Sequence, residues 1–143
     1  MEHPIGAQDN QRTILVVDDD PVILKFVSRL LIDSDYHVLT ATSGVTALQQ
    51  SKDYKGEIHL LLSDFQMPVM SGIELATQMS LERPQLKVLM MSGFTAGMLV
   101  LNEGWHFLAK PFIPSQLCAL VLGLVFPNGG PKSSNQRETG NVV

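Results

Sequence analysis

Three consecutive aspartates, Asp18, Asp19 and Asp20, directly follow the apolar segment Thr13–Val17 in the stretch ILVVDDDP. Two unit charges about 4 Å apart repel by about 4 kcal/mol at an effective dielectric constant of about 20. Such crowding lowers stability unless a positive charge lies close to it. We therefore expect a cation to bind near these carboxylates.

Other polar side chains also come directly after apolar segments. Asp64, Ser92 and Lys110 each follow the end of a later segment of this kind. In open parallel sheets, ligands bind beyond the carboxyl ends of the strands. These three side chains are therefore expected to converge with Asp18 and Asp19 on one edge of a sheet.

The elements that must position these side chains alternate along the chain. Helical spacing of apolar residues separates five apolar or β-branched segments, and this alternation predicts an α/β fold with a doubly wound, five-stranded parallel sheet and about five helices. We expect a short helix between Ala96 and Asn102, and a last helix from Pro114 to about Val125. The predicted strands are Thr13–Val17, His37–Thr42, Ile58–Ser63, Leu86–Met91 and His106–Ala109.

Composition indicates one folded unit. The chain has 143 residues, of which 45% are hydrophobic. We expect a folded domain at 12–126, a flexible N-terminal arm at 1–11 and a disordered polar tail at 127–143, because the arm and the tail are polar and the tail is rich in Gly, Pro, Ser and Asn. No further domain is expected after residue 126.

Charge and hydropathy exclude several classes of partner. The net charge is -4, and lysines and arginines are scattered, so direct nucleic-acid binding is not expected. The longest apolar stretch, Leu117–Phe126, is far shorter than the roughly 20 residues that cross a bilayer. There is no secretory signal pattern, and the single Cys118 fits a reducing compartment. We expect a cytoplasmic protein that does not bind membranes.

Four motifs occur in order: ILVVDDDP, LLLSDFQMPVMSG, VLMMSGFT and FLAKPF. Together they resemble the CheY-like receiver domain of two-component response regulators over residues 12–126. The resemblance implies a flavodoxin-like strand order, 2-1-3-4-5. It also implies Mg²⁺-dependent transfer of a phosphoryl group from a histidine kinase or phosphotransfer protein to an aspartate, which switches the conformation of a signalling face. Such a protein catalyses its own phosphorylation and dephosphorylation and is not a conventional enzyme.

The resemblance assigns a role to each candidate residue. It makes Asp64 the phosphoacceptor, and it makes Asp18, Asp19, Asp64 and the backbone carbonyl of Gln66 the protein ligands of Mg²⁺. These oxygens are the kind of ligand that Mg²⁺ prefers. Asp20 is not required as a ligand, and we expect it to cap the following helix.

Two further residues complete the expected catalytic group. The resemblance makes Lys110 the cation that reaches the phosphoryl group and Ser92 the hydroxyl that switches its loop. A hydroxyl at this position can donate a hydrogen bond to a phosphoryl oxygen, so covalent chemistry would become a conformational signal.

Some features depart from the pattern of the family. Phe107 stands near the aromatic switch position but lacks a hydroxyl, and we expect Phe94 and Gln66 to tune hydrolysis of the phosphoryl group. The interval between Ser92 and Lys110 looks about one turn shorter than usual, so the fourth helix is expected to be short or irregular. The last helix, with QLCALVLGLVF, has no charged residue. We therefore expect the face of the fourth helix, fifth strand and last helix to contact a second copy or another partner, unless the tail or the arm covers it.

Two other functions compete with this interpretation. A haloacid-dehalogenase-like phosphatase would use Asp18 as nucleophile and Asp20 as acid and base, but it needs an acidic motif after its lysine. Only Glu138 follows Lys110 here. A pseudo-receiver that binds a partner without phosphorylation usually lacks the acceptor, an acid or the lysine, and this chain retains all of them.

Overall fold

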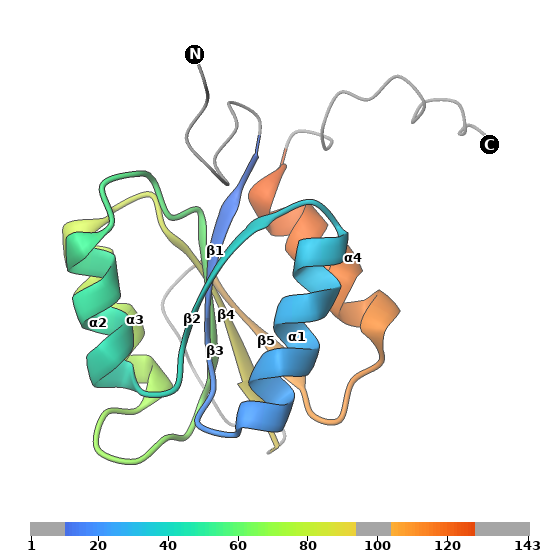
Figure 1. The fold of residues 1–143 in the computed structure, drawn as a ribbon, viewed down its shortest axis with the longest axis horizontal. Helices are drawn as coiled ribbons and strands as arrows, with labels where there is room; N and C mark the ends of the chain where they lie inside the picture. The colour runs from blue at the N-terminus through green and yellow to red at the C-terminus, as the bar shows by residue number, and fades with distance from the viewer. Residues whose placement is uncertain (1–10, 94–103, 128–143) are drawn as a thin grey trace.

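The computed structural model describes residues 11–93 and 104–127. Five parallel strands form one sheet in the order β2-β1-β3-β4-β5, and four helices lie in the described part of the chain (Figure 1). In chain order the elements are β1 (Thr13–Val17), α1 (Pro21–Asp33), β2 (His37–Ala41), α2 (Gly44–Asp53), β3 (Leu60–Asp64), α3 (Gly72–Glu82), β4 (Lys87–Ser92), β5 (Trp105–Ala109) and α4 (Pro114–Val125).

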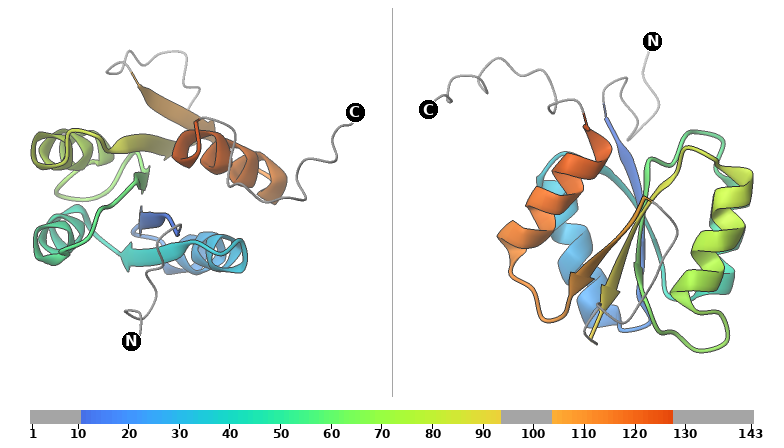
Figure 2. Two further views of the ribbon diagram at one scale, coloured as in Figure 1. Left: turned by 90° about the horizontal axis from the view of Figure 1, so that it is seen from above. Right: turned by 180° about the vertical axis from the view of Figure 1, so that it is seen from behind.

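The helices cover both faces of the sheet. Figure 2 shows α1 and α4 on one face and α2 and α3 on the other. Successive side chains of a strand point to opposite faces, so Ile14 and Val16 of β1 join the core under α1 and α4. Leu15 and Val17 join the second core under α2 and α3. A strand buried on both faces needs a continuous apolar run, which explains the sequence of β1.

The predicted fold class and strand order are confirmed, as is the number of strands. β3 ends at Asp64 and β4 at Ser92, one residue later than predicted in each case. The short helix expected between Ala96 and Asn102 lies outside the described residues, as do nearly all of the predicted arm and tail. None of the described helices has the length and hydrophobicity needed to cross a membrane.

Local signals explain the start of α1. Asp20 is its N-cap, and its carboxylate accepts a hydrogen bond from the backbone N–H of Val22 at 2.9 Å. Pro21 occupies the first turn, where its missing N–H costs nothing. The expected capping role of Asp20 is therefore confirmed.

The start of β1 and the end of α4 meet at the pole opposite the carboxyl ends of the strands. Arg12 Nε donates a hydrogen bond to the backbone oxygen of Val125 at 3.0 Å. The guanidinium carbon of Arg12 also lies 4.5 Å from the ring centre of Phe126, a distance at which a cation and an aromatic face attract each other. This contact joins the start of β1 to the end of α4.

Candidate functional site

The carboxyl ends of β1, β3, β4 and β5 bring the predicted side chains to one edge of the sheet. Asp18 directly follows β1, Asp64 and Ser92 are the last residues of their strands, and Lys110 directly follows β5. The register pairs Asp64 with Met91 and so places the ends of β3 and β4 side by side. The backbone N–H of Lys110 donates to the oxygen of Ser92 at 2.7 Å, which joins the last two strand ends.

Three carboxylates form a cluster at this edge. One oxygen each from Asp18, Asp19 and Asp64 can be chosen so that all three lie within 4.8 Å of one another. Asp18 is only 1% exposed, whereas Asp19 is exposed and Asp64 is partly exposed. The cluster is therefore open to solvent on one side and buried on the other.

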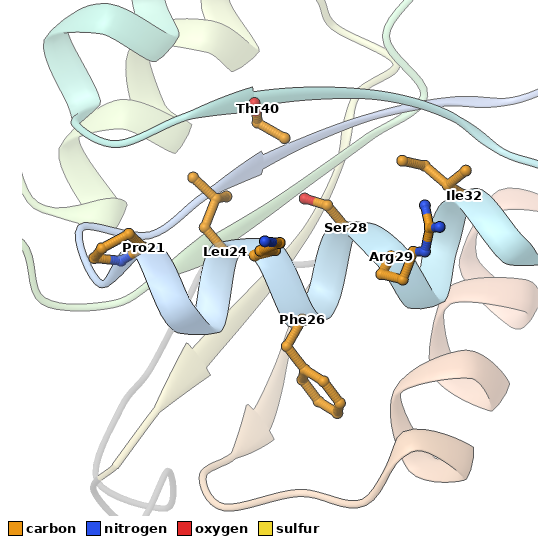
Figure 3. Close-up of a pocket in the computed structure, with 8 residues that line it drawn as sticks. Pro21, Leu24, Phe26, Ser28, Arg29, Ile32 and Thr40 are labelled. Atoms are coloured by element: carbon orange, nitrogen blue, oxygen red, sulfur yellow. The ribbon is translucent and has the colours of Figure 1, made fainter.

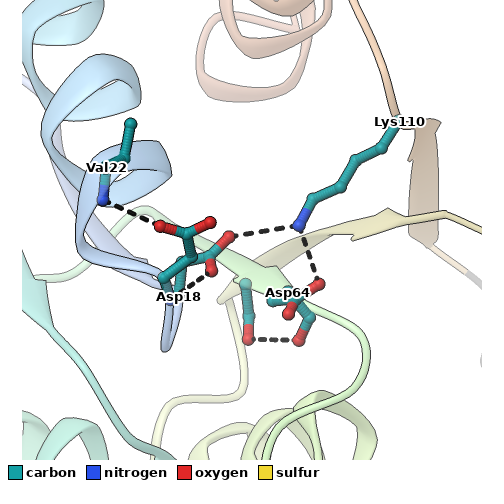
Figure 4. Close-up of polar contacts among 6 residues, drawn as sticks. Asp18, Val22, Asp64 and Lys110 are labelled. Atoms are coloured by element: carbon teal, nitrogen blue, oxygen red, sulfur yellow. Dashed lines mark hydrogen bonds and ion pairs between the residues drawn. The ribbon is translucent and has the colours of Figure 1, made fainter.

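Lys110 supplies the positive charge nearest to the cluster. Its Nζ lies 3.3 Å from Asp18 Oδ2 and 3.1 Å from Asp64 Oδ1 (Figure 4). Figure 4 shows the two carboxylates, at the ends of β1 and β3, directed toward this one ammonium group. One lysine thus joins two acids that lie 92 and 46 residues away in the sequence.

Asp20 is held away from the cluster. Its backbone N–H donates to Asp18 Oδ1 at 2.9 Å, while its own carboxylate accepts from Val22. The N–H of Asp20 therefore fixes the orientation of the Asp18 carboxylate. Of the three consecutive aspartates, two belong to the site and the third holds the helix start.

The electrostatics of the cluster distinguish Asp64 from its neighbours. Burial raises the pKa of Asp64, the ammonium of Lys110 opposes that rise, and the charges of Asp18 and Asp19 add to it. Burial alone would lower the pKa of Lys110, but its hydrogen bonds and charge interactions with Asp64 and Asp18 raise it above the ordinary value. Lys110 therefore stays protonated at neutral pH and serves as a permanent cation beside Asp64.

The segment after Asp64 is fixed by the backbone. The N–H of Phe65 donates to the oxygen of Met91 at 2.8 Å, and the N–H of Gly72 donates to the oxygen of Phe65 at 3.0 Å. Gln66 is exposed in this turn, and its carbonyl as a metal ligand stays a prediction. The ring of Phe107 lies edge-on to the ring of Phe65, with 6.0 Å between their centres.

Of the three remaining residues predicted to switch or tune the site, the structure describes Ser92 and Phe107 but not Phe94. Ser92 is buried at the end of β4 and therefore lies at the predicted edge. Phe107 is half-buried on β5, and its role in switching stays a prediction. Phe94 lies outside the described residues.

Sequence reasoning did not single out Gly72, which supports the site from α3. A Cβ atom at this position would lie 2.3 Å from the backbone oxygen of Asp64 and 3.0 Å from Met90 Sδ. Only a residue without a side chain allows α3 to begin so close to the end of β3. The SG pair at the end of the motif LLLSDFQMPVMSG was the available signal, because Ser71 caps α3 and Gly72 follows it.

The donor set fits a hard divalent cation. The three carboxylates outnumber the single ammonium group, so the site carries uncompensated negative charge. All side-chain donors of the cluster are oxygens, which suit Mg²⁺ and exclude a site built for soft metals. Asp18, Asp19 and Asp64 are therefore the residues that could hold such an ion.

The protein has a doubly wound parallel sheet with acids and a lysine at its carboxyl edge, and this combination indicates a receiver domain. The family model described as the response regulator receiver domain matches residues 14–122. The chain therefore belongs to the response regulator receiver domain family.

Two curated relatives illustrate the range of proteins that contain this domain. A two-component response regulator of Oryza sativa subsp. indica is 34% identical over 120 residues, which cover 81% of this chain and 18% of the relative. The sensor kinase CckA of Brucella abortus (strain 2308) is 33% identical over 113 residues, which cover 76% of this chain and 12% of that kinase. The chain thus spans less than a fifth of the length of these relatives.

Solved structures show the same fold. A CheY-like response regulator receiver domain protein from Methanospirillum hungatei JF-1 has a TM-score of 0.75 and 27% identity, covering 82% of this chain and 96% of that one. The receiver domain of the hybrid histidine kinase CckA has a TM-score of 0.71 and 30% identity, covering 79% of this chain and 98% of that one.

Proposed function

We propose that this receiver domain accepts a phosphoryl group on Asp64 from the phosphohistidine of a histidine kinase or phosphotransfer protein. The observation that carries the proposal is the position of Lys110, whose ammonium lies within 3.3 Å of both Asp18 and Asp64. Asp18 is buried, whereas Asp64 is partly exposed at the end of β3. Of the two carboxylates that pair with Lys110, Asp64 is thus the one that a phosphodonor can approach.

The bond changes at phosphorus involve Asp64 and the phosphodonor. An oxygen of the Asp64 carboxylate forms a bond to phosphorus while the phosphorus–nitrogen bond of the donor breaks. The electron pair of that bond stays on the imidazole, which takes a proton from solvent, and Asp64 becomes an acyl phosphate. Lys110 donates a hydrogen bond to a phosphoryl oxygen and offsets the negative charge of the incoming group.

We propose Mg²⁺ as the cofactor. Asp18, Asp19 and Asp64 would hold the ion together with the backbone carbonyl of Gln66. When bound, the ion would offset the repulsion between the carboxylate and the anionic phosphodonor. The net negative charge of the cluster and its all-oxygen donors support this assignment.

Phosphorylation is proposed to change the conformation through Ser92. Its hydroxyl would donate a hydrogen bond to a phosphoryl oxygen on Asp64 and draw the segment after β4 toward the site. Since the backbone of Lys110 is bonded to Ser92, such a movement would also reach β5 and Phe107. Phe94 and Gln66 are proposed to limit the access of water to the acyl phosphate.

Exposed apolar side chains support a protein as the phosphodonor. Val22 at the start of α1, Val69 between β3 and α3, and Ile113 before α4 are 74%, 91% and 59% exposed. All three lie on segments that begin at the carboxyl ends of the strands, around the acidic cluster. Such residues suit burial against the surface of a protein that carries a phosphohistidine.

A second proposed contact is the outer face of α4 and β5. α4 has no charged residue, and its exposed side includes Ala119, Leu122 and Gly123. We propose that this face binds a second copy or a downstream partner. We also propose that the protein lies in the cytoplasm and makes no direct contact with nucleic acid or membrane.

Intact-mass measurement after incubation with Mg²⁺ and acetyl phosphate tests the phosphoacceptor. The wild-type chain is expected to gain one phosphoryl group, and chelation of Mg²⁺ is expected to abolish the gain. Asp64→Asn should remove it, whereas the matched control Asp20→Asn should retain it because Asp20 caps α1. Retention in Asp64→Asn would refute the assignment of the acceptor.

The same samples separate the alternatives. A phosphatase would turn over the phosphodonor and lose activity in Asp18→Asn without stable gain of mass. A pseudo-receiver would gain no mass under any condition. Phosphotransfer from a panel of purified histidine kinases would then identify the donor.

A further inference from the structure

A groove lies between α1 and the edge strand β2, apart from the acidic cluster. Its volume is about 710 Å³. Leu24, Ser28 and Ile32 line it from one stripe of α1, and Thr40 lines it from β2 (Figure 3). Residues four apart share one face of a helix, so the stripe forms a continuous wall along the strand.

Ser28 makes the groove more than an apolar surface. The residue is 8% exposed, and its hydroxyl oxygen is buried without a hydrogen-bond partner in the described structure. Figure 3 shows this oxygen on the side of α1 that faces Thr40. A buried polar atom without a partner lowers stability. Rotation of the Ser28 side chain into the groove would let a carbonyl or carboxylate oxygen of a ligand supply the missing bond.

The strand beside the groove has backbone groups available for pairing. β2 is the outermost strand of the sheet, and it bonds to β1 through alternate residues such as His37 and Ala41. Val38 and Thr40 therefore direct their backbone groups away from β1. The side-chain amide of Gln50 donates to the backbone oxygen of Thr40. The N–H of Thr40 and the N–H and carbonyl of Val38 are therefore the backbone groups that an added strand would bond.

The charged residues of the groove are both cationic. Lys25 and Arg29 belong to its lining, which contains no acidic residue. Arg29 Nε lies 3.8 Å from the carboxylate of Asp33, but both side chains are about two-thirds exposed. Ion pairs this exposed contribute little, so Arg29 can exchange its partner for a carboxylate in the groove.

We propose that the groove binds a short extended peptide that pairs with β2 as an added strand, and that the side chains at every second position, which face α1, include both apolar and acidic ones. Backbone pairing with an exposed edge gives affinity, and pockets for alternate side chains give specificity. The apolar side chains would pack on Leu24 and Ile32. Acidic side chains would pair with Lys25 and Arg29, and the Ser28 hydroxyl would donate a hydrogen bond to a peptide oxygen. This binding does not require phosphorylation of Asp64.

Selection from a phage-displayed library of random 12-residue peptides tests the proposal on the full chain. Enriched sequences are expected to carry apolar and acidic residues at every second position, which are the positions that face α1. Synthetic versions should shift the amide resonances of Val38 and Thr40 in nuclear magnetic resonance spectra. Failure to enrich any sequence, or shifts confined to the segment around Asp64, would overturn the proposal.

Variants locate the binding in the groove. The double variant Lys25→Glu, Arg29→Glu should weaken peptide binding at least about tenfold. The double variant Lys55→Glu, Lys87→Glu, which changes two exposed lysines outside the groove, serves as the charge-matched control. Ser28→Ala should weaken binding roughly threefold to tenfold without loss of stability, because it removes an unpaired hydroxyl. Unchanged affinity in both groove variants would contradict the proposal. Phosphorylation of the Lys25→Glu, Arg29→Glu variant by acetyl phosphate should match wild type and so keeps this test separate from that of Asp64.

Discussion

Replacing Gly72 with alanine is expected to damage both the stability of the domain and the chemistry of Asp64. The new Cβ would lie 2.3 Å from the backbone oxygen of Asp64. Ordinary contacts between carbon and its neighbours begin near 3.5 Å, so α3 and the end of β3 must separate by about 1 Å. Overpacking of this kind typically costs about 1–3 kcal/mol.

The consequence for phosphorylation follows from the atom that is displaced. A misplacement of about 1 Å in a reacting group can lower a rate by about 100-fold, and the shifted atom belongs to the proposed acceptor itself. Urea denaturation would measure the loss of stability, and the initial rate of mass gain with acetyl phosphate would measure the chemistry. Both quantities should fall in Gly72→Ala.

Gly123 provides the matched control. It lies in α4, and a Cβ added there would meet no other atom within 4 Å. Gly123→Ala should therefore raise stability by about 0.5–1 kcal/mol through helix propensity and leave the phosphorylation rate unchanged. If Gly72→Ala unfolds at the wild-type urea concentration and is phosphorylated at the wild-type rate, the close approach of α3 to Asp64 is not a constraint and the reasoning fails.

Three further substitutions test separate parts of the structure. Asp20→Ala removes the cap on Val22 and should cost about 1 kcal/mol in urea denaturation; an unchanged midpoint would exclude a role for this cap. Val69 is a β-branched residue with a φ of 70°, so Val69→Gly should stabilise the domain by about 1 kcal/mol, and a lower melting temperature would count against strain there. The raised pKa of Asp64 means that the folded state holds this proton more tightly than the unfolded chain. The contribution of Asp64 to stability should therefore fall as the pH rises from the ordinary value of 3.8 through the folded pKa. Without Mg²⁺, Asp64→Asn should be more stable than wild type above this window and similar below it; a constant difference across pH would show that the carboxylate is not destabilised.

The elements of the fold could be predicted because their signals are local. β1 is buried on both faces and therefore reads as one apolar run, and the start of α1 follows from Asp20 and Pro21. The predicted ends of β3 and β4 were each one residue too early. Asp64 and Ser92 are polar, so they looked like the first residues of loops, but backbone pairing between neighbouring strands continues through them.

The site could be predicted only in part. The convergence of Asp18, Asp64 and Lys110 follows from their places at strand ends, and the structure confirms it. The role of Gly72 depends on how closely one helix approaches one carbonyl oxygen, which no pattern of residue types records. The unpartnered hydroxyl of Ser28 depends in the same way on packing between α1 and β2, because a serine within a helix usually looks like an ordinary surface residue.

The contact of Arg12 with Val125 and Phe126 bears on how the domain can be combined with other sequences. The entry and exit of the folded unit lie next to each other and far from the acidic edge. Both positions therefore lie at the pole opposite Asp64. A unit whose two ends lie side by side can be inserted into a longer chain without a change in its own fold.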